Sequence, residues 1–211
     1  MIASEYLAAY LRIATAVVPV GVYFLILGLL NSRRHPQMLS GRQDFALLMS
    51  AISPLFVVPV LQYIGMSIWS VAAAAAGVAG LILLLAPRGR TWVVYNLSAA
   101  EARKVVAQAL LETRTSFSES RKGFHLEDSA GFVELGGFSL LRNVSITMRG
   151  CDRQASARFE SALSAALASC RTEANPAGVT MLLVATASLI APFAMIAHEV
   201  PEIVRLLSDL F

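Results

Sequence analysis

The polar residues best suited to chemistry gather in one short stretch. His125, Glu127 and Asp128 could together bind a metal ion or transfer a proton, because imidazoles and carboxylates act as ligands and as bases. His125 and Glu127 alternate with Phe124 and Leu126, however, so they share the solvent-facing side of a predicted strand. No serine or cysteine nucleophile is implied beside them. We therefore expect a solvated strand and turn here, and we do not expect an enzyme.

A group of basic residues could instead attract an anion. Arg121 and Lys122, together with Arg142 and Arg149, could give a sheet a basic face toward anionic lipid or phosphate. The chain has no GxxxxGK[ST] phosphate loop and no glycine-rich strand-to-helix turn for a dinucleotide, and Gly136-Gly137 predicts a hairpin turn. No cofactor is expected. The candidate polar patch comprises Arg121, Lys122, His125, Glu127 and Asp128.

The two cysteines predict neither a disulfide nor a metal site. Cys151 and Cys170 flank one expected helix, along which their Cα atoms would lie roughly 28 Å apart at about 1.5 Å per residue. That separation is far beyond disulfide reach. They lack CxxC spacing and a nearby histidine pair, so no zinc site is expected.

Long apolar segments set the fold class. The 211-residue chain is 56% hydrophobic and 15% charged, whereas globular proteins are about 25% charged. A helix of about 20 apolar residues can cross the roughly 30 Å of bilayer hydrocarbon. We therefore expect an α-helical integral membrane protein with four transmembrane helices. Their expected positions are 1–31 (with the N-terminal flank), 45–64 and 66–86 (a helical hairpin within 45–87), and 176–198.

The third expected span contains a run rich in alanine and glycine. Small residues four positions apart, Ala73 with Gly77 and Ala76 with Gly80, let two helix backbones approach closely in lipid. These four residues are therefore candidates for helix packing. The sequence leaves open whether the partner is a helix of this chain or of another subunit.

The polar segment 88–175 is expected to form a small α+β domain inserted between the third and fourth spans. Thr91–Asn96 is typical of a strand, and Ser98-Ala99-Ala100-Glu101 predicts a capping box that begins an amphipathic helix. Period-two patterning over Phe117–Arg149 predicts about three strands, and a second amphipathic helix follows Asp152. The order β-α-β-β-β-α predicts an antiparallel sheet with two helices on one face.

Positive charge predicts how the chain crosses the membrane. The basic loop 32–44 and the residues after the third span are rich in arginine. The first terminus has the acidic Glu5, the hairpin turn has no charge, and the tail has three acids against Arg205. By the positive-inside rule the arginine-rich flanks and residues 88–175 face the cytoplasm, and both termini lie outside. A bacterial inner membrane is the expected location. The arginines are Arg33, Arg34, Arg42, Arg88 and Arg90.

The last segment, 199–211, is expected to form an amphipathic tail helix. One side of this helix would be apolar, and the acidic residues Glu202 and Asp209 would be repelled by anionic lipid. A protein partner is therefore favoured over the lipid headgroup region. The candidate partner-binding residues are Ile203, Leu206, Leu207 and Leu210.

These features predict a non-catalytic membrane subunit or scaffold. Other membrane-protein subunits would bind its transmembrane helices and tail within the lipid bilayer, and a soluble cytoplasmic protein would bind the α+β domain. The alternative is a transport component for a neutral or lipid-like solute, because four prolines could interrupt the spans near the midplane. Basic residues are dispersed among nearly as many acids, so no nucleic-acid partner is expected. The prolines are Pro19, Pro54, Pro59 and Pro192.

Overall fold

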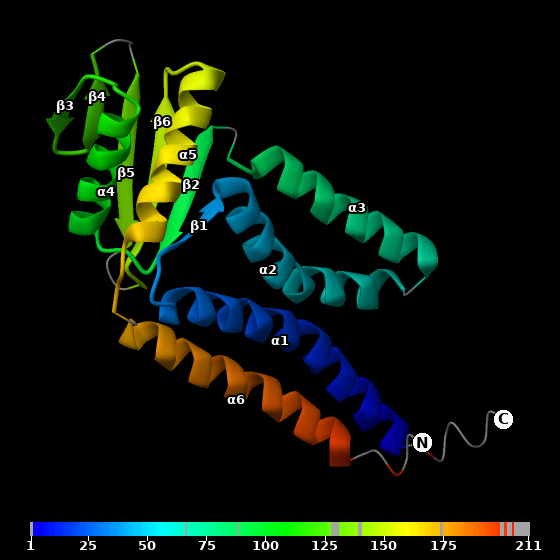
Figure 1. Ribbon diagram of the computed structural model, residues 1–211. Helices are drawn as coiled ribbons and strands as arrows, with labels where there is room; N and C mark the ends of the chain where they lie inside the picture. Colours follow the sequence, from blue (N-terminus) through cyan, green and yellow to red (C-terminus); the bar gives the residue numbers. More distant parts are fainter. Residues whose placement is uncertain are drawn as a thin grey trace. The chain divides into compact units, whose positions relative to one another are not determined.

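A computed structural model shows long apolar helices together with a sheet that carries two further helices (Figure 1). Some predicted residues lie outside the part of the chain that it describes, namely Arg88, Asp128 and the apolar tail residues Ile203, Leu206, Leu207 and Leu210. The described residues are 2–65, 67–87, 89–127, 131–138, 141–173, 175–198, 201 and 204.

The chain forms two compact units, and both are discontinuous in sequence. The apolar unit contains Met1–Ile26, Leu47–Leu84 and Met181–Phe211, and the sheet unit contains Leu27–Ala46 and Leu85–Thr180. The sheet unit therefore includes residues that precede the second apolar helix, in addition to the long polar segment expected as the domain.

Four helices are long and apolar: α1 (Ile2–Ser32), α2 (Gly41–Ile64), α3 (Ile68–Leu85) and α6 (Pro176–His198). Among the described residues, three of them have the length and composition of a membrane span, with mean hydropathies of 2.4 for α1, 2.0 for α2 and 2.3 for α3. The described apolar stretch of α6, Pro176–Pro192, is shorter than the ~20 residues that a span needs. A fourth span therefore stays a prediction.

A six-stranded antiparallel sheet forms the centre of the sheet unit, with strand order β1-β2-β6-β5-β4-β3. Helices α4 (Ala99–Glu112) and α5 (Arg153–Ser169) pack on one face of it, as the sequence predicted (Figure 1). The strands are β1 (Gln37–Ser40), β2 (Arg90–Tyr95), β3 (Phe117–Ser120), β4 (Gly123–Leu126), β5 (Phe132–Phe138) and β6 (Asn143–Arg149).

Two of these strands were not expected, so the predicted order β-α-β-β-β-α is incomplete. The basic loop 32–44 contains β1, which pairs with β2 and places Met38 opposite Val94. The region after α4 holds four strands, because Arg121 and Lys122 form a tight turn between β3 and β4. The two added strands, QMLS and FSES, lack the alternation of apolar and polar residues that predicted the strand at Phe124–Leu126.

The predicted turn at Gly136-Gly137 is also wrong, because both glycines lie within β5. Their neighbours on β6 explain why glycine suits this part of the strand. A Cβ atom added to Gly136 would lie 2.6 Å from the Ser145 Oγ. Glycine here permits close approach to the adjacent strand, which is a known role of glycine within sheets.

The core of the sheet unit lies between the sheet and the helix pair. On β6 the predicted alternation is confirmed, since Val144, Ile146 and Met148 are buried while the residues between them are partly exposed. Phe159 of α5 packs on Trp92 of β2, with ring centroids 5.8 Å apart. Other fully buried members of this core are Val94, Leu97, Val106, Leu110, Phe124, Val133 and Leu163.

Candidate functional site

The predicted polar patch lies on the exposed hairpin of β3 and β4. Arg121 and Lys122 form its turn, and the His125 ring packs on Phe132 of β5 with centroids 4.6 Å apart. Among the described residues, no group of three or more His, Cys, Asp or Glu side chains could hold a metal ion. The structure therefore places His125 against an aromatic ring and brings these side chains into no catalytic arrangement among the described residues.

The predicted packing residues of α3 face away from α2. A Cβ atom added to Gly77 or Gly80 would meet no atom within 4 Å, and Ala73 and Ala76 are exposed. None of the described residues of α3 is buried. The opposite side of α3 borders a cavity shared with α1 and α2, and carries Val71, Ala74, Ala75, Val78, Ala79 and Ile82.

Close helix packing occurs instead at two glycines that the sequence did not single out. In the apolar unit, a Cβ atom on Gly21 of α1 would lie 2.9 Å from Leu189 Cδ2 of α6. In the sheet unit, a Cβ atom on Gly178 of α6 would lie 2.9 Å from Asn31 Cβ of α1. The sequence feature that could have predicted these two contacts is an isolated glycine within an apolar helix, because glycine lets helices approach closely.

One polar side chain contacts several separate parts of the sheet unit, that of Asn96, which follows β2. It is fully buried, and its φ of 59° lies in the left-handed region that asparagine tolerates better than most residues. The two N–H donors of the Asn96 Nδ2 group are shared among three acceptors: the Arg33 carbonyl (2.8 Å), the Thr172 Oγ1 (2.9 Å) and the Glu173 carbonyl (3.1 Å). One amide therefore joins the end of β2 to the segment after α1 and to the segment before α6.

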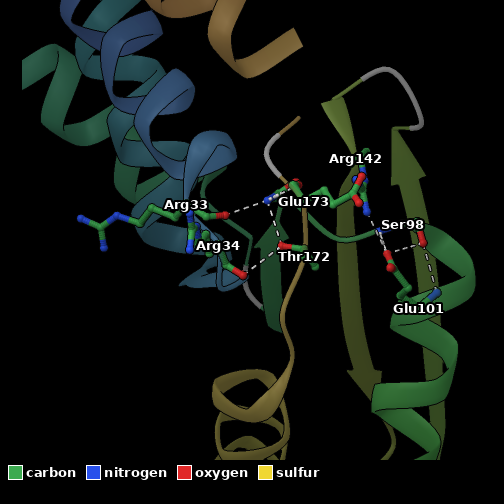
Figure 2. Close-up of polar contacts among 8 residues, drawn as sticks. Arg33, Arg34, Ser98, Glu101, Arg142, Thr172 and Glu173 are labelled. Carbon is green, nitrogen blue, oxygen red and sulfur yellow. Dashed lines mark hydrogen bonds and ion pairs between the residues drawn. The ribbon is translucent and has the colours of Figure 1, made fainter. Parts of the chain in front are cut away.

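Backbone hydrogen bonds reinforce this connection, as Figure 2 shows around Arg34 and Thr172. The Thr172 N–H donates to the Arg34 carbonyl (2.8 Å), and the Asn175 N–H donates to the Asn31 carbonyl (3.2 Å). Carbonyl groups in the last turn of a helix have no N–H partner within that helix. Here the Asn175 N–H supplies a partner for the Asn31 carbonyl. We call Asn31, Arg33, Arg34, Asn96, Thr172, Glu173 and Asn175 the junction.

The two ends of β2 are both anchored. Beside the junction, Tyr95 donates a hydrogen bond from its hydroxyl to Asp44 in the first turn of α2. At the other end, the Arg90 guanidinium donates to the Asp152 carbonyl and to the Ser156 hydroxyl of α5. Within the sheet unit, β2 and the residue after it thus bind three segments: the one after α1, the first turn of α2, and the one before α6.

A capping box lies next to the junction, and it confirms the predicted start of α4. The Ser98 Oγ accepts a hydrogen bond from the Glu101 N–H, and the Glu101 carboxylate accepts one from the Ser98 N–H (3.0 Å). Arg142, which has a φ of 50°, adds an ion pair to Glu101 at 3.0 Å (Figure 2). The Ser98 hydroxyl hydrogen bond is the main cause that lowers the pKa of Glu101, and Arg142 adds to it.

Comparison of the chain with models of protein families, with curated proteins and with solved structures found no match. The candidate site is therefore assigned from geometry alone. The junction holds separate parts of the chain together through buried hydrogen bonds. Its described residues include no pair of a nucleophile and a base.

The lowered pKa of Glu101 predicts a pH-dependent contribution to stability. Because the carboxylate is favoured in the folded state, its contribution is present above the unfolded pKa of about 4.4 and is lost as pH falls through the lower folded value. Glu101→Gln should lower the free energy of unfolding by only about 0.5 kcal/mol at neutral pH, because solvent screens the half-exposed carboxylate and glutamine can still accept the Ser98 N–H. Below pH ~4 the difference from the wild type should shrink.

Chemical unfolding of the full chain at several pH values measures this difference. Glu119→Gln is the matched control, because Glu119 also pairs with an arginine, Arg103 at 2.8 Å, but caps no helix. A Glu101→Gln deficit that stays constant from neutral to acidic pH would contradict the assignment.

Proposed function

We propose that the protein is a non-catalytic membrane subunit or scaffold, which binds a membrane helix of a partner subunit through α3. The observation that carries this proposal is the open face of small residues on α3. Gly77 and Gly80 have no atom within 4 Å of an added Cβ, although the opposite side of the helix faces α2. Helix association in lipid depends on close packing at small residues, which this face offers.

The anchoring of β2 supports a scaffold in a second way. Within the sheet unit, Asn96 and Tyr95 hold together the segment after α1, the first turn of α2 and the segment before α6, through buried or partly buried hydrogen bonds. A soluble partner bound to the sheet unit would therefore contact a unit that also contains these helix ends. We assign the soluble partner of this unit to the cytoplasm, together with the basic loop that contains β1.

We further propose four spans in a bacterial inner membrane, with both termini outside. The arginine-rich flanks support this orientation, because basic residues concentrate on the cytoplasmic side. A reporter that is active only in the cytoplasm should work when it is fused after Gly123, and one that is active only outside should work after Phe211. Signal from outside at the Gly123 fusion would overturn the orientation.

The proposed packing face of α3 predicts the effect of a bulky substitution. Gly77→Leu should prevent close approach of the partner helix and reduce copurification of the partner at least several-fold, while the chain itself still inserts and folds. Affinity purification in mild detergent followed by quantitative mass spectrometry measures this loss.

Val78→Leu is the matched control, because Val78 borders the cavity on the opposite side of α3. The Val78→Leu substitution also introduces a leucine, one position after Gly77, but on the side of α3 opposite the open face. If both variants retain the same copurifying proteins as the wild type, the open face binds lipid alone and the scaffold proposal loses its main support.

A transport component is the second candidate, and one observation favours it. Within the apolar unit, α1, α2 and α3 border an open cavity of about 510 Å³ that is lined mainly by apolar side chains. Thr15 and Ser53 border it, but their hydroxyls donate to carbonyls of their own helices, Leu11 at 2.7 Å and Ser50 at 3.4 Å. Such a cavity suits a neutral or lipid-like solute, as the sequence-based alternative proposed.

A further inference from the structure

The sheet unit contains a pocket that none of the preceding proposals uses. Its volume is about 500 Å³, within the range of small-molecule sites. It lies where α4 ends and α5 begins, whereas the junction lies where α4 begins and after α5 ends. We call it the α4–α5 pocket.

The floor of the α4–α5 pocket is apolar and belongs to the core. Leu110 and Phe159 are 0% and 1% exposed, and Leu126 and Met148 are also buried. Because these side chains are only 0–7% exposed, the floor offers a ligand body van der Waals contacts and not a large apolar surface to remove from water. Small-molecule sites commonly combine such a floor with a few polar groups at the rim.

The rim of the pocket carries an excess of positive charge. Arg114 and Arg158 both line it, both are exposed, and neither forms an ion pair within the described part of the chain. The single acidic residue of the lining, Asp152, is already engaged, because its carboxylate accepts the Ala155 N–H. Two guanidinium groups are therefore free to bind an anion.

We propose that the α4–α5 pocket binds an organic phosphate, with the apolar body on the floor and the phosphate between Arg114 and Arg158. A phosphate offers three terminal oxygen atoms, so each guanidinium can form charge-assisted and even bidentate hydrogen bonds with it. Thr113 and Thr115 also line the rim, where the Thr113 hydroxyl donates to the Leu110 carbonyl (2.9 Å) and lies 3.0 Å from the Thr115 hydroxyl. This site is independent of the proposed membrane partner.

The phosphate can belong to a soluble compound or to a lipid. Arg90, which is hydrogen-bonded to the Asp152 carbonyl at the pocket wall, follows the end of α3 after a short connection. The shared chemistry of the phosphate group leaves both sources open. The experiment below therefore includes an arm that separates them.

Isothermal titration calorimetry with phenyl phosphate tests the pocket in the full chain, reconstituted in phosphatidylcholine nanodiscs. The wild type should bind one phenyl phosphate per chain, and inorganic phosphate and phenol should each bind at least tenfold more weakly. Arg114→Ala combined with Arg158→Ala should weaken binding by about 10- to 100-fold, because hydrogen bonds to charged groups are lost.

Two matched controls separate the pocket from general effects. Arg153→Ala combined with Arg171→Ala removes the same charge from exposed arginines outside the pocket lining and should leave binding unchanged. Ala155→Leu fills the pocket and should weaken binding, whereas Ala157→Leu lies on the exposed side of α5 and should not. Circular dichroism confirms that each variant is folded.

The proposal is overturned if phenyl phosphate does not bind the wild type. It is also overturned if inorganic phosphate binds equally well, or if both arginine pairs have the same effect. Nanodiscs that also contain phosphatidic acid then identify the source. Weaker phenyl phosphate binding to the wild type in these nanodiscs shows that a lipid headgroup occupies the pocket, and unchanged binding shows that the ligand is soluble.

Discussion

The buried amide of Asn96 is the interaction on which the sheet unit depends. Its Nδ2 group lies within hydrogen-bond distance of three oxygen atoms, which belong to Arg33, Thr172 and Glu173. A buried donor that loses its partner costs about 1–3 kcal/mol, so this amide strongly favours the arrangement in which all three segments are in place. The left-handed backbone at Asn96 turns the chain from β2 toward α4 at the same point.

This constraint explains why the sheet unit is discontinuous in sequence. Strand β1 comes from before α2 and pairs with β2, and the segment after α5 returns to the loop that precedes β1. The core between the sheet and the helices α4 and α5 forms largely from local amphipathic elements. The junction then joins to this core the residues at the ends of α1 and α6, which lie far apart in the chain.

Much of the local structure could be predicted because its causes are local. The Ser98–Glu101 capping box, the Asp152 N-cap and the alternation along β6 each follow from residues a few positions apart. The apolar helices likewise follow from composition over about 20 residues.

The missed features depend on residues that are distant in sequence. Strand β1 is defined by its pairing with β2, and Gly136 lies within a strand because of its contact with Ser145. The role of Asn96 could not be predicted from the sequence, since its partners are far away in the chain and Asn96 was expected as the end of a strand. The α4–α5 pocket was missed for the same reason, because Arg114 and Arg158 are brought together by the packing of two helices.

Amide hydrogen exchange of the full chain with Asn96→Gly tests the central role of the junction most directly. Glycine keeps the left-handed backbone and removes only the side-chain amide. Exchange at the Thr172 and Asn175 N–H groups should accelerate by about 10- to 100-fold, while buried core amides such as those of Val106 and Ile146 keep their protection. Unchanged exchange at both Thr172 and Asn175 would show that the Asn96 side chain does not hold these segments together.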